Sequence, residues 1–182
     1  GLNAFAIVGL PDKAVEEARD RTSSAIKNSG YESPKSKNHK VVVSLSPADL
    51  KKEGANFDLA IALGYLLANE DIDFDPKGRV FVGELTLSGD IRPGKGVISL
   101  VEEARKKGYR EIYVPIDNTR EAALVSGIDV YGVKTLREII DHLEDKNRFQ
   151  LETYGKEFFE MRKADGKDMT LDEARDLMTK PH

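Results

Sequence analysis

The sequence of 182 residues contains no cysteine. Disulfides, thiolate nucleophiles and zinc–thiolate sites are therefore excluded, and we expect a cytoplasmic protein in a reducing compartment. No apolar run reaches the roughly 18 residues that a membrane-spanning helix requires. No signal peptide is recognisable at the start either. We accordingly expect no membrane partner.

Metal-binding patterns are also scarce. The three histidines are isolated from one another, and no H-E-x-x-H pattern or carboxylate–histidine pair accompanies them. Aspartates alternate over residues 71–75, as at the start of a calcium-binding EF-hand loop. However, Pro76 stands where that loop needs glycine, and Val82 stands where it needs glutamate. The sequence therefore predicts an acidic surface loop and no metal site.

A basic charge balance is missing as well. The net charge is −4 and the isoelectric point is about 5.5. A basic field over the whole surface, of the kind that holds nucleic acid, is therefore absent. Basic residues do cluster locally, at 35–40 and 105–110. We interpret each cluster as a solvated loop or helix end.

Hydrophobic residues make up 40% of the chain, which is enough for a real core. Strand-like runs alternate with helix-like runs, and this order predicts an α/β domain with some parallel strand pairing. We expect this domain to span residues 1–145, and residues 146–182 to form a polar helical linker or a partner-docking extension. Strands are expected at 4–9, 40–47, 79–87, 111–115 and 129–133, and helices at 12–30, 59–68, 97–108, 118–127 and 135–145. We expect Asn118 or Asp117 to cap the helix over 118–127, and Thr135 to cap the helix over 135–145.

The segment GDIRPGKG, residues 89–96, comes within one residue of the phosphate-binding P-loop pattern G-x-x-x-x-G-K-[ST]. That pattern needs a hydroxyl after the lysine to coordinate magnesium, and Gly96 has none. Ser88 and Gly89 moreover read as a tight turn. We interpret the segment as a hairpin followed by the start of a helix, with a degenerate nucleotide binder as an alternative.

Three long segments, in the same order, match one family. They are AFAIVGLPDKAVEEARDRTSSAIKNSG, VSLSPADLKKEGANFDLAIALGYL and FVGELTLSGDIRPGKGVISLVEEARKKG. The chain from residue 1 to about 145 resembles the N-terminal domain of the magnesium-chelatase-like competence ATPases, the ComM/YifB family. The resemblance implies an α/β fold, an α+β sandwich of the ribosomal-protein-S5 domain 2 type, similar to the proteolytic domain of Lon proteases. The family usually has one more strand before Gly1, so we expect a trimmed piece of a longer protein.

The resemblance also suggests where Lon-type chemistry would lie. Lon-type enzymes use a serine activated by a lysine, and the matching positions here are Asn56 and Ile98. An amide cannot replace the attacking hydroxyl, and an isoleucine cannot accept its proton. We therefore expect no catalytic residue and no peptidase activity. A peptidase with a displaced dyad, built from Ser46 and Lys95, is the alternative.

The segment 89–96 is, on this resemblance, the corner between a hairpin and a helix. We expect Gly89 to serve the turn, and Pro93 and Gly94 to shape the entry to the helix. Gly54 and Gly96 are expected as further turn positions.

In the family, the ATP site with its magnesium lies in a separate AAA+ module, so we expect no cofactor in this fragment. The implied partners are that module and the neighbouring subunits of a homo-oligomer, hexameric in the parent protein. The parent would act on DNA in recombination during natural transformation. We expect a non-catalytic domain that regulates this motor or contacts its DNA, and a pure oligomer-assembly domain is a further alternative.

Contact with phosphates would involve Lys51, Lys52, Arg92 and Lys95, which the resemblance gathers near one face. The simpler interpretation is that Lys51 and Lys52 are only solvated and that Asp58 caps the helix that follows it.

Overall fold

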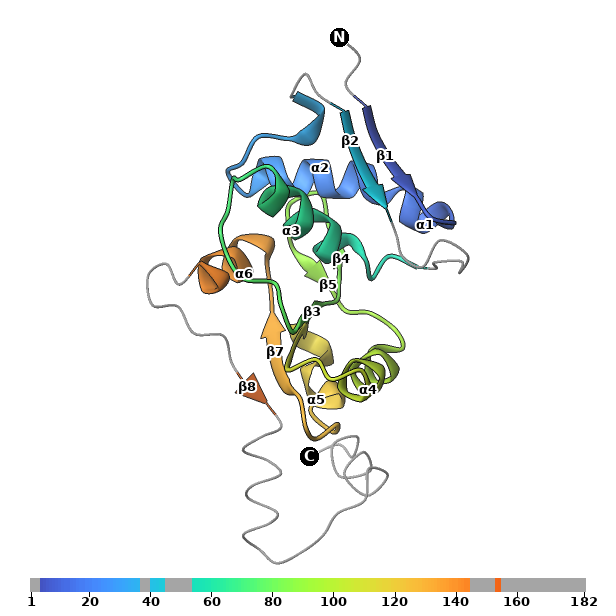
Figure 1. The fold of residues 1–182 in the computed structure, drawn as a ribbon, viewed down its shortest axis with the longest axis vertical. Helices are drawn as coiled ribbons and strands as arrows, with labels where there is room; N and C mark the ends of the chain where they lie inside the picture. Colours follow the sequence, from blue (N-terminus) through green and yellow to red (C-terminus); the bar gives the residue numbers. More distant parts are fainter. Residues whose placement is uncertain (1–3, 37–39, 45–53, 145–152, 155–182) are drawn as a thin grey trace, which may run out of the picture.

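The computed structural model describes residues 4–36, 40–44, 54–144 and 153–154, and the structural statements below concern these residues (Figure 1). The fold is a mixed α/β arrangement with three small sheets. No helix within the described ranges is long and apolar enough to cross a membrane.

The first sheet pairs β1 (Ala4–Val8) with β2 (Lys40–Ser44) in parallel, and Ala4 lies opposite Lys40. Between these strands the chain forms α1 (Lys13–Glu16) and α2 (Ala18–Asn28). A 3-10 turn at Pro34–Ser36 then leads back toward β2.

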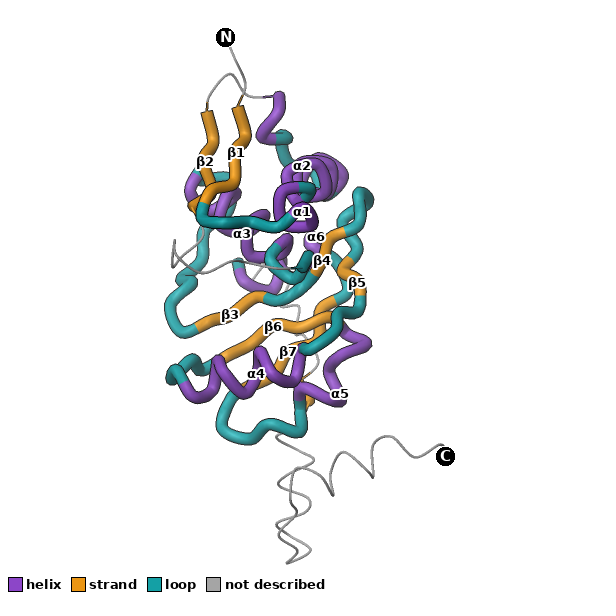
Figure 2. Tube along the Cα trace, turned by 90° about the vertical axis from the view of Figure 1, so that its right-hand side faces the viewer, coloured by secondary structure: helices purple, strands orange, loops and turns teal. Residues whose placement is uncertain are grey.

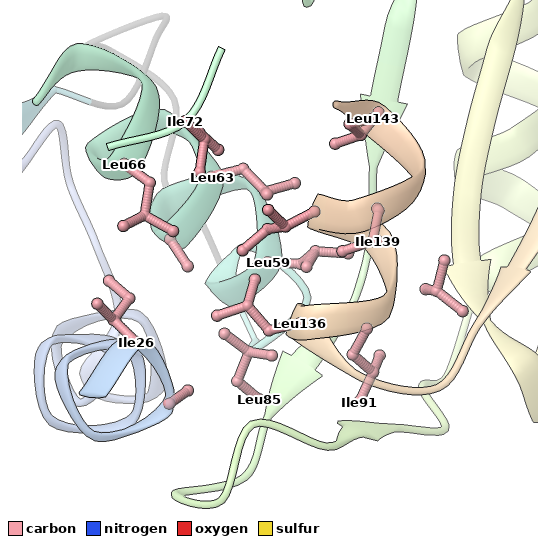
Figure 3. Close-up of a cluster of buried hydrophobic side chains, with 14 of the residues drawn as sticks. Ile26, Leu59, Leu63, Leu66, Ile72, Leu85, Ile91, Leu136, Ile139 and Leu143 are labelled. Atoms are coloured by element: carbon pink, nitrogen blue, oxygen red, sulfur yellow. The ribbon is translucent and has the colours of Figure 1, made fainter. Parts of the chain in front are cut away.

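The main core lies between three helices that come from distant parts of the sequence. Figure 3 shows side chains of α2, α3 (Asp58–Ala68) and α6 (Leu136–Leu143) pointing toward one another. Helix α3 is apolar on nearly all sides, as is typical of a helix that is covered by other elements on most of its surface. The side chains that are fully buried here include Ile26, Leu59, Leu66, Leu85, Leu136, Ile139 and Ile140.

The largest sheet has the order β3-β6-β7-β8. Strands β3 (Arg79–Phe81), β6 (Glu111–Pro115) and β7 (Asp129–Val133) are parallel, and β8 (Thr153–Tyr154) runs antiparallel to β7. Side chains alternate between the two faces of this sheet. Tyr113 joins the main core, whereas its neighbours in β6 face a second cluster under the helices on the other side.

Helices α4 (Val97–Lys106) and α5 (Thr119–Ala122) cover that other face (Figure 2). A short antiparallel hairpin, β4 (Glu84–Leu85) and β5 (Ile91–Arg92), leads from β3 into α4. The hairpin thus connects the main core with the helical layer of the large sheet.

Several predictions from the sequence are confirmed. The chain is mixed α/β with parallel pairs, and the segment 89–96 joins a hairpin to a helix. Thr135 caps α6, since its hydroxyl oxygen accepts a hydrogen bond of 3.0 Å from the amide of Glu138. The boundary near residue 145 stays a prediction. The predicted extension lies outside the described residues, except for residues 153–154 in β8.

Three predicted elements differ. The helix expected over 12–30 is interrupted at Glu17. Close to this break, the guanidinium of Arg21 donates a hydrogen bond of 2.6 Å to the carbonyl oxygen of Ala14. The strand expected over 79–87 is split, because Gly83 bonds to the loop before α3 instead of to a neighbouring strand. The helix expected over 118–127 is reduced to the single turn of α5.

Candidate functional site

The candidate site is the corner where the loop before α3 meets the loop before α4. Gly83 holds the first loop, since its amide donates to the Asn56 carbonyl oxygen and its own carbonyl accepts from Leu59, both at 3.0 Å. A Cβ atom at Gly83 would lie 2.7 Å from Cγ2 of Ile91. Glycine therefore allows the backbone at this position to lie directly against Ile91 of β5.

Asp12 fixes the beginning of the same loop. One carboxylate oxygen accepts from the Val15 amide at 2.8 Å and caps α1, and the other accepts from the Gly54 amide at 2.9 Å. Gly54 has a left-handed backbone with φ of 80°, as a turn glycine should. A single carboxylate thus ties the first helix to the loop that carries Asn56.

The Asn56 side chain faces the loop before α4. Its Nδ2 atom makes a long hydrogen bond of 3.5 Å to the Lys95 carbonyl oxygen. Its Oδ1 atom lies only 2.6 Å from the position that a Cβ atom of Gly94 would occupy. The amide of Asn56 is therefore packed directly on the Gly94–Lys95 backbone.

Gly94 is also held by the side chain of Asn118. The Gly94 amide donates to Oδ1 of Asn118 at 2.8 Å, and Nδ2 of Asn118 donates to the Gly94 carbonyl oxygen at 2.9 Å. Nδ2 also donates to Oε1 of Glu121 at 2.6 Å. The side chain of Asn118, which we expected only as a possible helix cap, makes no capping hydrogen bond.

A buried ion pair lies behind this corner. The guanidinium of Arg21 donates to both carboxylate oxygens of Asp58, at 2.6 and 3.0 Å, and Oδ2 also accepts from the Leu85 amide at 3.0 Å. The side chain of Asp58 has no exposed surface. Burial raises the pKa of Asp58, whereas the contacts with Arg21 and the Leu85 amide act in the opposite direction. Asp58 is the first residue of α3 and not its cap, so the capping prediction was wrong.

The remaining predicted site residues are placed as follows. Ile98 is half-buried in the first turn of α4 and packs against the second apolar cluster. Arg92 and Lys95 are exposed, and Arg92 lies opposite Glu84 in the hairpin. Lys51, Lys52 and Ser46 lie outside the described residues.

The predicted turn residues take distinct parts. Gly89 and Gly96 have left-handed backbones, with φ of 93° and 69°, and Gly96 is the N-cap of α4. Pro93 is exposed between the hairpin and this cap. Gly94 is needed for a different reason, which is the close approach of Asn56.

The chemistry available at this corner is limited. Every lysine within the described ranges is exposed, so none of them is a desolvated amine of the kind that accepts a proton from serine. No group of three or more His, Asp or Glu residues in the same ranges is placed to hold a metal ion. Gly96 offers no hydroxyl, and Asn118 occupies the backbone groups of Gly94. This loop therefore does not fit a site for a nucleotide phosphate and its magnesium.

Comparison with known proteins identifies the class of domain. Residues 1–118 match the family described as subunit ChlI of Mg-chelatase. The chain is 40% identical to competence protein ComM of Haemophilus influenzae over 154 residues, which are 84% of this chain and 30% of ComM. It is 42% identical to YifB of Escherichia coli over 151 residues, which are 82% of this chain and 29% of YifB.

A more distant similarity connects the chain with proteases. Lon protease 2 of Bacillus subtilis is 29% identical over 99 residues, which are 53% of this chain and 18% of that protein. The chain therefore belongs to the Mg-chelatase ChlI family, as a ChlI-type domain of the ComM/YifB magnesium-chelatase-like group with similarity to Lon. It spans less than a third of the length of ComM and YifB.

Proposed function

We propose that the chain is a non-catalytic Lon-like domain of a magnesium-chelatase-like AAA+ protein, with the sandwich arrangement of ribosomal protein S5 domain 2. ATP and magnesium would be bound by another module of the parent protein, which would assemble as a hexamer. The domain would regulate that motor or contact its DNA during recombination. The similarity to ComM supports a role in competence, and the similarity to Lon supports the fold.

The observation that carries the non-catalytic part is the environment of Asn56. At this position, where the resemblance places the Lon serine, an amide contacts the Lys95 carbonyl and packs on Gly94. The matching lysine position holds Ile98, whose side chain packs against the second apolar cluster. These two positions therefore supply neither a nucleophile nor a base.

The DNA contact would use the exposed cations of the same corner. Arg92 and Lys95 flank the start of α4, where the positive end of the helix dipole adds to their charge. Lys51 and Lys52, which lie outside the described residues, are the other two cations that we propose for this contact. Together they would bind phosphates through charge and without reading sequence.

Binding of a fluorescein-labelled DNA duplex, followed by anisotropy at several salt concentrations, tests the contact. Replacing Arg92 and Lys95 by glutamine should lower the slope of log affinity against log salt by about 1.8, since each phosphate contact contributes roughly 0.9. The matched control is Lys27→Gln with Lys40→Gln, which removes the same charge from exposed positions in α2 and β2 (Figure 1). Equal losses in both double variants, or no binding by the parent chain, would contradict the proposal.

The absence of peptidase activity has its own test. Casein and unstructured peptides should remain uncut by the chain over long incubation. Turnover that disappears in Lys95→Ala or Ser46→Ala would instead support the displaced Ser/Lys dyad.

A second candidate, an assembly domain, is favoured by one surface. A groove of about 330 Å³ between β2 and α3 is lined mainly by apolar side chains, including Phe57, Ile61 and Tyr65. Val42 also lines this groove and is 52% exposed. Size-exclusion chromatography of the chain with Val42→Glu distinguishes the two roles, because loss of an oligomer together with unchanged DNA binding would support assembly.

A further inference from the structure

Three cationic side chains and a tyrosine surround a hollow at the far end of α4, away from Arg92 and Lys95. The hollow has a volume of about 410 Å³ and is formed by the loop that enters β3 and the loop that follows α4. Figure 2 shows both loops on the same side of the molecule. The lining residues are Lys77, Gly78, Lys107, Gly108, Tyr109 and Arg110.

The backbone holds the two loops together. The carbonyl oxygen of Gly78 accepts from the amides of Arg110 and Glu111, at 2.9 and 3.1 Å. Nη2 of Arg110 donates to the Lys77 carbonyl oxygen at 3.3 Å. A Cβ atom at Gly78 would lie 2.8 Å from Nε of Arg110, so glycine is what allows the guanidinium to lie over this loop. The hollow is therefore built by tertiary contacts between two loops.

Tyr109 is both exposed and fixed at its backbone. Helix α4 ends with the Gly108 amide donating to Arg105 and the Tyr109 amide donating to Ala104, at 3.0 and 3.1 Å, and Gly108 has φ of 86°. This arrangement is the hydrogen-bonding pattern of a Schellman cap. The tyrosine that follows is nevertheless 40% exposed. An aromatic side chain next to three cations, held on an ordered backbone, is suited to stack on a flat ligand.

The residues that line the hollow carry only positive charge, because no carboxylate is among them. Asp75 lies beside the hollow, and its carboxylate accepts a hydrogen bond of 3.0 Å from the Lys77 amide. The nearest acid on α4 is Glu103, 3.0 Å from the ammonium of Lys107, but both side chains are more than 60% exposed and such a pair is weak. Glu111 is already engaged by Arg79 and by the hydroxyl of Tyr113, both at 2.9 Å.

Cations in the last turn of a helix also stabilise its negative end. That effect explains Arg105, Lys106 and Lys107. It does not explain Lys77, which comes from a different loop, nor the exposed ring of Tyr109. These two residues point to a ligand that combines negative charge with a flat apolar face.

We propose that this hollow binds single-stranded nucleic acid, with phosphates at Lys77, Lys107 and Arg110 and one unpaired base stacked on Tyr109. Stacking on an aromatic ring requires a base that is not paired, which favours a single strand over a duplex. The inference rests on the proposed DNA-contacting role and adds a second contact, about 15 Å from the start of α4 because a ten-residue helix has that length.

The test measures the affinity of the full chain for a fluorescein-labelled oligothymidylate by anisotropy. Tyr109→Ala should weaken binding about fivefold or more, as expected for one lost stacking contact, while Tyr109→Phe should stay close to the parent. Lys77→Gln with Lys107→Gln should lower the salt slope by about 1.4, since each contact to a single strand contributes roughly 0.7. Lys27→Gln with Lys40→Gln is again the matched control, and thermal unfolding checks that every variant is folded.

Three outcomes would overturn this inference. The first is an unchanged affinity for the oligothymidylate in folded Tyr109→Ala. The second is an equal loss of affinity in the control double variant. The third is that inorganic phosphate, at constant ionic strength, displaces the oligothymidylate equally well from the parent chain and from Tyr109→Ala. If Arg92 and Lys95 matter and this hollow does not, only the present inference fails. If the parent chain binds neither the duplex nor the oligothymidylate, the proposed function fails as well.

Discussion

Asn118 and Gly94 form two reciprocal hydrogen bonds, side chain to backbone, across 24 residues of sequence. The side-chain amide of Asn118 thereby pairs with the backbone N–H and C=O of one residue, as the opposite residue of an antiparallel strand would. It fixes the loop before α4 against the chain that follows β6, and the side chain of Asn56 also packs on Gly94.

Asn118→Ala should destabilise the fold by about 1–3 kcal/mol, because the half-buried N–H and C=O groups of Gly94 lose their partners. Asn118→Asp should be no better at neutral pH, because a carboxylate cannot donate to the Gly94 carbonyl and would lie beside Glu121. Urea unfolding measures both changes. Asn28→Ala is the control, since Asn28 is exposed and its side chain donates a long-range hydrogen bond to the Leu87 carbonyl oxygen.

Gly94→Ala should cost about 1–3 kcal/mol through overpacking, because the new methyl group would meet Oδ1 of Asn56 at 2.6 Å. The backbone of Gly94 is not left-handed, so strain of that kind does not contribute. Asn56→Ala in the same chain should restore most of the loss. A double variant that is no more stable than Gly94→Ala would show that the side chain of Asn56 is not the obstacle.

Breaking the Arg21–Asp58 pair should be among the most costly single changes in the chain. Arg21→Met leaves a fully buried carboxylate without its counter-charge, at a cost of about 3–5 kcal/mol. Asp58→Asn should cost less, because the Arg21 side chain is 16% exposed and can reach water. Urea unfolding of both variants and of the double variant gives the coupling between them, which should be well above zero.

The loss of folding stability in Arg21→Met, relative to the parent chain, should also depend on pH. Burial raises the pKa of Asp58, and removing Arg21 removes an interaction that lowers it. The folded variant then binds more protons than the unfolded chain above the ordinary pKa, so its stability falls as pH rises through that window. The difference in free energy of unfolding between the parent chain and Arg21→Met, measured in urea, should therefore be larger at pH 8 than at pH 5. A difference that does not change with pH would contradict this interpretation of Asp58.

Tyr113 should remain protonated in the folded chain when exposed tyrosines ionise. Its ring is fully buried and its hydroxyl donates to Glu111 at 2.9 Å, and burial together with this carboxylate raises its pKa well above the ordinary value. Since the unfolded chain releases this proton more easily, the contribution to stability is lost as pH rises above about 10. The stability difference between the parent and Tyr113→Phe, measured by urea unfolding, should shrink between pH 9 and pH 11.

The sequence predicts most of the elements because their signals are local. The hydroxyl of Thr135 caps α6, and Gly96 precedes α4, as the pattern of these residues indicates. The break between β3 and β4 could not be predicted in this way. The break exists because the backbone of Gly83 forms hydrogen bonds with Asn56 and Leu59. These partners are distant in the sequence, and no local pattern around Gly83 predicts them.

The candidate site was predictable only in part. The resemblance identified Asn56 and the loop of Gly94, but the contact with Asn118 depends on tertiary structure and has no local signal. For Asp58 a signal was available. Asp58 begins a helix that is apolar on nearly all sides, and a carboxylate that is buried with such a helix requires a charged partner, which is Arg21 here.

The connectivity of the parallel strands has a consequence for synthesis. β3 pairs with β6, and the hairpin and α4 are made between them. A nascent chain that has left the ribosome only as far as α4 therefore carries β3 without its ladder partner and α4 without the sheet it covers. Such an intermediate exposes a strand edge together with apolar side chains, and it is the stage at which a chaperone would have most to protect.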